Sequence, residues 1–125
     1  MSVKFTLNLE GGERVRRAFR RVDVLATREV IDAVAETAID ITRMTKGNAP
    51  VRTGRLRSSY REIFTRDRLS AEIGTDVEYA PFVEFGTISP PRAPQPHLFP
   101  AWEFWRPHYN ARMRQAFQKV ARRVR

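Results

Sequence analysis

The stretch YAPFVEFGT, residues 79–87, gathers three aromatic side chains and a valine around one carboxylate, Glu84, and one glycine, Gly86. That much apolar surface is typical of a core or an interface. The proline inside the stretch and the proline-rich run after it indicate a chain that changes direction. We expect one or two helical turns here. Glu84 could do chemistry, the stretch could be a corner that holds the fold together, or it could be a docking surface.

Downstream, the sequence predicts an extended arm and then a long helix. Residues 88–97 carry four prolines, so we expect an exposed loop in which His97 is exposed or caps a turn. From Pro100 onward, apolar residues recur every three or four positions, which is typical of a helix with one buried face. They are Trp102, Trp105, Tyr109, Met113, Phe117, Val120 and Val124. Pro107 should kink this helix or mark a restart, and its basic residues, Arg112 among them, should largely face away from the core.

Upstream, the sequence predicts a strand, a long helix and a hairpin. Residues 3–9 alternate apolar and polar side chains, the pattern of a half-buried strand, which ends at Gly11-Gly12. A helical region then extends to about Lys46, either as one helix that changes neighbours or as two helices with a bend near residues 23–27, and Gly47-Asn48 is its stop. Its apolar stripes are Val15, Phe19 and Val22, followed by Ile31, Val34, Ala38 and Ile41. Residues 56–65 and 69–73 are predicted strands joined by a turn at 66–68.

These elements predict a single α+β domain over residues 1–125, with a small antiparallel sheet packed against a long N-terminal-half helix and a C-terminal helix. The C-terminal helix combines two tryptophans with a basic face, as membrane-surface helices do. The cover that a small sheet needs explains its apolar face better. No apolar run approaches the roughly 20 residues of a membrane span, and we expect neither a membrane partner nor a signal peptide.

Charge is unevenly distributed along the chain, whose net charge is +9. Residues 106–125 hold seven Lys or Arg and no acid, and residues 50–68 hold six Arg against two acids. Residues 69–103 reverse the sign, with five acids against Arg92 alone. Such a polarised molecule can attract nucleic acid, and it can equally direct how copies of one protein pack head to tail.

The arginines at residues 52–61 are candidates for an interaction site. Alternation along a strand would place Arg55, Arg57 and Arg61 on one side. With Tyr60 and Arg52 they resemble the residues that hold a phosphate backbone. Alternatively they pair with acidic surface on a neighbouring copy or another protein, and the counterparts that we expect then are Glu72, Asp76 and Glu78.

Signals for catalysis are weak. The chain has no cysteine, and its histidines, His97 and His108, stand in no metal-ligand spacing. Glu84 among aromatics could serve as an acid, but no second catalytic group lies nearby in the sequence, and a capping or arginine-paired carboxylate is the better interpretation. We therefore expect no enzyme, no metal, no cofactor and no small-molecule substrate. A nuclease that uses Glu62, Glu72 or Glu84 ranks last.

Three blocks, NAPVRTGRLRSSY (48–60), IGTDVEYAPFVEFGT (73–87) and PQPHLFPAW (94–102), resemble the signature blocks of the HK97 gp10-like proteins of tailed phages. The matching residues are Ala49, Pro50, Thr53, Gly54, Leu56 and Ser59, then Tyr79, Ala80, Glu84, Gly86 and Thr87, and finally Pro96, Leu98, Pro100 and Ala101. The long loop at 90–96 and the strongly basic C-terminus depart from the family pattern.

The resemblance implies a structural virion protein, made in the bacterial host cytoplasm, that joins head to tail. Such proteins form a ring at the neck, between the portal side and the tail tube, and double-stranded DNA passes through. The implied partners are further copies, other neck proteins and tail-tube or tail-terminator proteins. The resemblance also implies a corner in which Tyr79, Phe82, Val83 and Phe85 tuck onto the core. There Gly86 permits an unusual backbone geometry, and Glu84 satisfies turn amides or an arginine. A basic protein that binds or condenses nucleic acid is the alternative.

Overall fold

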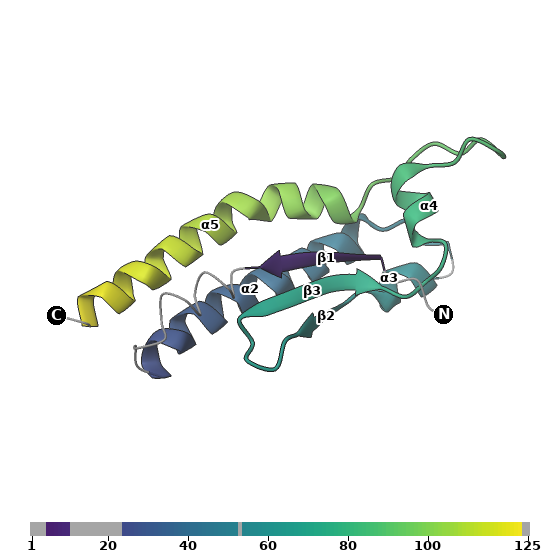
Figure 1. Cartoon of the computed structure of the whole chain (residues 1–125). Coiled ribbons are helices and arrows are strands. Elements are labelled where there is room, and N and C mark those ends of the chain that lie inside the picture. The colour runs from purple at the N-terminus through teal and green to yellow at the C-terminus, as the bar shows by residue number, and fades with distance from the viewer. Residues whose placement is uncertain (1–4, 11–23, 53, 124–125) are drawn as a thin grey trace.

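The computed structural model of the chain describes residues 5–10, 24–52 and 54–123. In chain order the described elements are β1 (Phe5–Glu10), α2 (Val24–Asn48), α3 (Arg55–Ser59), β2 (Arg61–Phe64), β3 (Ser70–Thr75), α4 (Ala80–Phe85) and α5 (Leu98–Arg123), as Figure 1 shows. The first residues of the predicted strand, its predicted end at Gly11-Gly12 and the predicted stripe of Val15, Phe19 and Val22 lie outside the described residues.

The three described strands form one antiparallel sheet in the order β1-β3-β2. In the register, Leu7 of β1 lies opposite Ile73, and Ile63 of β2 lies opposite Glu72. Between β2 and β3 the chain reverses in a tight turn, where the Asp67 carboxylate accepts a hydrogen bond from the Leu69 N–H at 3.1 Å. The predicted hairpin is therefore confirmed.

The predicted strand at residues 56–65 is only half right, because its first part is the short helix α3. Gly54 has φ 80, a left-handed conformation that turns the chain just before α3. Leu56 then buries its side chain, and the Ser59 hydroxyl donates to the Leu56 carbonyl at 2.6 Å. Local hydrogen bonds of this kind favour a turn of helix over an extended strand.

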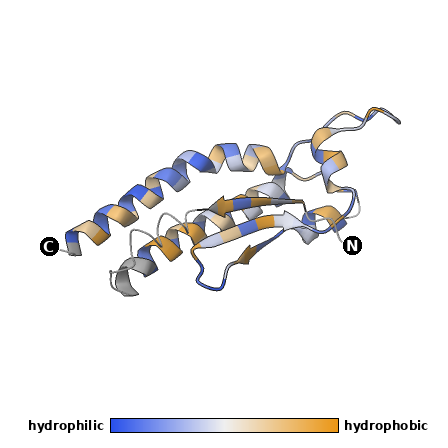
Figure 2. Cartoon of the chain, in the orientation of Figure 1, coloured by the Kyte–Doolittle hydropathy of each residue, from blue (hydrophilic) through white to orange (hydrophobic). Residues whose placement is uncertain are grey.

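Helices α2 and α5 run side by side, and α2 also packs against β3 (Figure 1). Of the predicted stripe on α2, Val34, Ala38 and Ile41 have no exposed surface. Hydrophilic and hydrophobic residues alternate along α5 (Figure 2), as expected for a helix with one face on the core. The α+β fold that the sequence predicts is confirmed.

Two expectations about α5 are revised. The helix is continuous through Pro107, which excludes the restart and leaves the kink as the remaining alternative. Arg112 does not face away from the core: its guanidinium lies 2.9 Å from the Asp40 carboxylate and donates to the Thr37 hydroxyl at 3.0 Å. Its side chain also covers the Trp105 ring at 5.3 Å. Arg112 therefore links α5 to α2 through an ion pair and a hydrogen bond. The apolar periodicity of α5 does not predict this contact.

Candidate functional site

Helix α4 buries a carboxylate and exposes two phenylalanines. Glu84 is 2% exposed, whereas Phe82 and Phe85 are 60% and 70% exposed. The prediction that Phe82 and Phe85 tuck onto the core is therefore wrong, although Tyr79 and Val83 do pack against it. Phe85 makes one edge-on ring contact, with Phe5 at 6.0 Å between ring centres. The sequence identified the apolar surface but could not say which of its side chains stay outside.

The Glu84 carboxylate caps the first turn of α5. It accepts hydrogen bonds from the backbone N–H groups of His97 at 3.1 Å, Leu98 at 2.9 Å and Phe99 at 3.3 Å. These amides have no partner inside the helix, and a negative charge there is favoured by the helix dipole. The prediction that Glu84 satisfies backbone amides is confirmed. Residues 84 and 98 belong to different helices, so this cap links the base of the arm to the start of α5.

His97 continues the network into the core, and the prediction that it is exposed is wrong, since its exposure is 0%. Its Nδ1 lies 3.0 Å from the Gln95 carbonyl and 3.2 Å from the Glu84 carboxylate. Two acceptors at Nδ1 place the proton there, which leaves Nε2 to accept from the Tyr60 hydroxyl. Burial, with a smaller contribution from the Glu84 charge, raises the pKa of Tyr60.

Sequence reasoning missed the contribution of His97 and Tyr60 because the two residues are 37 positions apart. The available signal was the position of His97 inside PQPHLFPAW, between residues that match the third block. With Glu84, they join three separate regions: the end of α3, helix α4 and the start of α5. Glu84, His97 and Tyr60 are buried and hydrogen-bonded within this network, which therefore connects the three regions.

Gly86 and Thr87 fix the point where the arm, residues 87–96, leaves α4. Gly86 has φ 78, and a Cβ there would lie 2.7 Å from the Arg92 carbonyl and 2.9 Å from the Pro94 nitrogen. The predicted special backbone at Gly86 is therefore confirmed. Thr87 and Arg92 exchange two backbone hydrogen bonds, at 3.1 and 3.0 Å. They close the tip of the arm, where Ile88 is 96% exposed.

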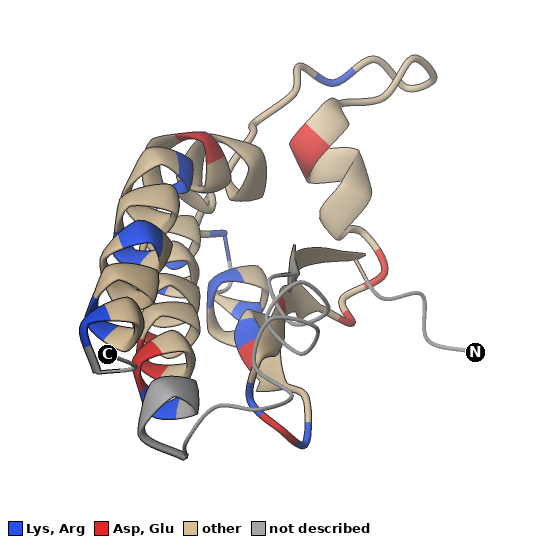
Figure 3. Ribbon diagram, turned by 60° about the vertical axis from the view of Figure 1, so that its left-hand side comes forward, with Lys and Arg blue, Asp and Glu red and all other residues tan. Residues whose placement is uncertain are grey.

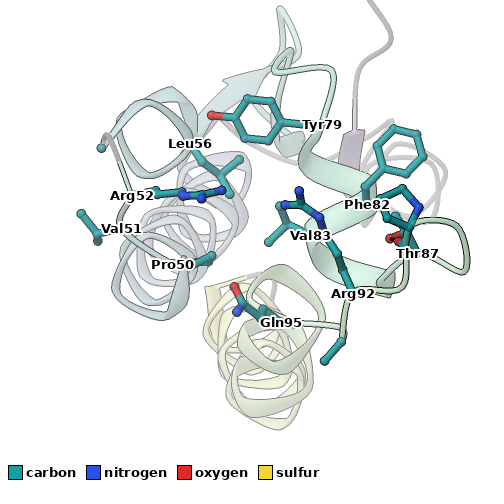
Figure 4. A pocket seen from close by; sticks show the side chains of 13 residues that line it. Pro50, Val51, Arg52, Leu56, Tyr79, Phe82, Val83, Thr87, Arg92 and Gln95 are labelled. Atoms are coloured by element: carbon teal, nitrogen blue, oxygen red, sulfur yellow. Dashed lines mark hydrogen bonds between the residues drawn. The ribbon is translucent and has the colours of Figure 1, made fainter.

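An open groove of about 990 Å³ lies between the loop before α3, helix α4 and the arm (Figure 4). Its apolar lining includes Pro50, Val51, Leu56 and Val83. The side chains of Arg52 and Arg92 come from opposite walls and point toward its middle (Figure 4). No hydrogen bond or ion pair joins either side chain to another described residue of the chain. Sequence reasoning did not indicate that these two arginines share one site.

Arg55, Arg57 and Arg61 do not share one strand face, because the first two lie on a helix. Arg52 lines the groove, whereas Arg55 and Arg57 lie on α3. Arg55 lies 3.5 Å from Glu78 of its own chain, with both side chains mostly exposed, and covers the Tyr79 ring at 5.6 Å. Arg61 begins β2 and shares a small hollow on the sheet with two of the predicted counterparts, Glu72 and Asp76.

Further cations follow the last helix: Figure 3 shows Lys and Arg at intervals along α5. Arg106, Arg114 and Arg122 of this helix are exposed. Within the described residues, no group of three or more His, Cys, Asp or Glu side chains could hold a metal ion. None of the described helices is both long enough and apolar enough to span a membrane.

Comparison with known proteins identifies one family. The family model described as "Bacteriophage HK97-gp10, putative tail-component" matches residues 13–86. The match includes Glu84, Gly86 and the loop that carries Arg52, and it ends directly before the arm. No curated protein and no solved structure matches the chain.

Proposed function

The chain belongs to the HK97-gp10-like family of bacteriophage tail components, and from this premise we propose that it forms a ring at the neck of the particle. Family membership makes it a structural protein of a tailed-phage virion. In the proposed ring, copies of the chain join the head side to the tail tube, and double-stranded DNA passes through the centre. Its partners are further copies and the neighbouring neck or tail-terminator proteins. It performs no catalysis.

The observation that carries the proposal is the exposed apolar surface around α4 and the arm. Phe82, Phe85 and Ile88 are 60%, 70% and 96% exposed, and they all lie within seven residues of each other. Large apolar side chains gathered at one end of a small protein mark a surface that another protein covers. The arm also projects from the body of the molecule (Figure 1), so it can reach a neighbour.

The arginines outside the groove fit the same proposal. Arg55, Arg57 and Arg61 are exposed, and the pair that Arg55 forms with Glu78 is exposed as well. We expect these side chains to meet acidic surface on the adjacent copy, where Glu72, Asp76 and Glu78 are the counterparts. Each exposed pair contributes only about 0–1 kcal/mol, but repetition around a ring fixes register and orientation.

Charge reversal tests this assembly. Phages that carry Arg55→Glu with Arg57→Glu should produce filled heads and separate tails, while the purified variant remains folded. The matched control reverses Arg114 and Arg122 on α5, which changes the net charge equally and should leave joining intact. Normal joining by the Arg55, Arg57 variant would contradict the proposed contacts. If electron micrographs of particles with labelled protein showed the label away from the neck, the neck assignment itself would fail.

A second candidate function, the binding of nucleic acid, is favoured by the exposed cations of α5. A basic helix face can hold a phosphate backbone without reading its sequence. If this is the main function, the isolated protein binds a DNA duplex in a strongly salt-dependent manner, and the Arg114, Arg122 variant loses that binding. A neck protein instead binds duplex weakly, because DNA must pass the ring without being held.

A further inference from the structure

We propose that the groove between the loop before α3, helix α4 and the arm binds an extended peptide segment of another protein. The segment carries a carboxylate next to a large apolar side chain. This inference goes beyond the ring, because it concerns a contact between the chain and a different protein.

The groove has the shape and the lining of a peptide site. Its volume of about 990 Å³ is open along one side, so an extended segment can lie in it. Leu56 at its base is 4% exposed and is held by the core, whereas Val51 is 58% exposed and is available for contact. An apolar side chain that enters the groove would cover Val51 and Val83 and remove their surface from water.

The two arginines define the charge of the ligand. Arg52 and Arg92 point toward the middle of the groove from opposite walls (Figure 4), and neither makes an ion pair with another described residue. A guanidinium presents a planar set of donors that matches a carboxylate, and such charge-assisted hydrogen bonds are among the stronger ones in proteins. A carboxylate between the two groups would therefore be bound from both sides.

A second copy of the chain fits this groove less well. Within the described residues, the two projecting segments are the β2–β3 turn and the arm. The turn places Asp67 between Arg66 and Arg68, and the arm carries Arg92 without any acid. Either segment would bring positive charge toward Arg52 and Arg92. The other exposed acids lie in the short link between β3 and α4 (Asp76 and Glu78) or on the long helices α2 and α5 (Asp32, Glu36 and Glu103), and none of them is in an extended segment that projects.

Nucleic acid also fits less well. A phosphate backbone is held by a row of cations and by aromatic faces on which bases stack. The groove offers two arginines and one exposed aromatic ring, that of Phe82, whereas most of its lining is aliphatic and Arg55 already covers the Tyr79 ring. These features favour a peptide.

Selection from a library of random short peptides tests the proposal. The wild-type protein should enrich peptides that have Asp or Glu next to Leu, Ile or Phe. The enriched peptide, labelled and titrated by fluorescence anisotropy, should bind at least about tenfold more weakly to the Arg52→Glu, Arg92→Glu variant, because two charge-assisted contacts are replaced by repulsion. Added NaCl should weaken binding to the wild type, and replacement of the carboxylate by its amide should do the same.

The matched control is the Arg57→Glu, Arg61→Glu variant, which has the same net charge and leaves the groove lining unchanged. It should bind the peptide as the wild type does, and both variants should keep the wild-type melting curve. The proposal is wrong if no peptide is enriched, if enriched peptides lack a carboxylate, or if both variants bind equally.

Two further outcomes would assign the groove to another occupant and would also overturn the proposal. One is loss of self-association in the Arg52, Arg92 variant, measured by sedimentation velocity, with peptide binding unchanged. The other is selective loss of binding to a short DNA duplex in this variant. Since peptide binding is measured on the isolated protein, its failure would leave the proposed ring untouched, and the absence of a ring would leave the peptide result valid.

Discussion

The two faces of α4 reverse the usual distribution of side chains. The inner face holds Glu84, which is 2% exposed, and the outer face holds Phe82 and Phe85, which are more than half exposed. The buried carboxylate is stable because backbone amides surround it, so it serves the fold. Most of the surface of the two phenylalanines is exposed, and in the proposed assembly a partner covers it. The buried face of α4 thus serves the fold, and the exposed face serves the proposed assembly.

The largest effect on stability is expected from Gly86→Val, at the end of α4. A side chain at φ 78 is strained, and its Cβ would meet backbone atoms at 2.7 and 2.9 Å. We expect a loss of about 3 kcal/mol or more in the free energy of unfolding, measured by urea denaturation. Gly47→Ala is the control, because a Cβ at Gly47 meets nothing within 4 Å. A Gly86→Val protein as stable as the wild type would disprove the account of this corner.

Glu84→Gln should have the next largest effect, about 2 kcal/mol. The amide keeps one acceptor oxygen, but it loses the charge and turns an NH₂ group toward backbone donors. Thermal melts of this variant and of Glu78→Gln provide the comparison, since the exposed Arg55–Glu78 pair should contribute less than about 1 kcal/mol. Equal melting temperatures for the two variants would show that the buried cap is no more important than a surface pair.

Tyr60→Phe should cost about 1 kcal/mol at neutral pH, because the bond to His97 is lost. The variant should also change the pH dependence. The pKa of Tyr60 is raised in the folded protein above its ordinary value of 10.0, so the unfolded chain releases this proton first as the pH rises. The wild type should therefore lose stability above pH 10.0, and this loss should be smaller in Tyr60→Phe. Parallel curves of unfolding free energy against pH would contradict the burial of this hydroxyl.

Phe82→Ser should have the smallest effect on stability, within about 0.5 kcal/mol, because the side chain is already in water. Its effect should appear instead in assembly, as reduced incorporation into particles. Ile39→Ser on α2 is a matched control, being another exposed apolar residue that lies away from α4. If Phe82→Ser unfolds the protein, or if it is incorporated normally, the contrast between the two faces of α4 fails.

The parts of this site that sequence reasoning predicted depend on local chemistry. A glycine after a short apolar helix indicates a positive φ, and a carboxylate beside a turn indicates a cap. The roles of Gly86 and Glu84 could therefore be predicted from the sequence. The bond between Tyr60 and His97 could not, because it depends on how distant segments meet. Phe82 and Phe85 also depend on how distant segments meet. The hydrophobicity of a side chain is the same whether the side chain is buried in the core or remains exposed. At α3, five residues between Gly54 and Tyr60 were too few to show a helical period.

The pairing of β1 with β3 also has a consequence for biosynthesis. Glu10 lies opposite Ser70, so the N-terminal strand has to wait for 60 more residues before its partner has been translated. At about 5–20 residues per second, that interval is roughly 3–12 s. During this time the apolar side of α2 also lacks β3 and α5, the elements that cover it. The pairing of β1 with β3 can therefore form only late in translation, after β3 has been made.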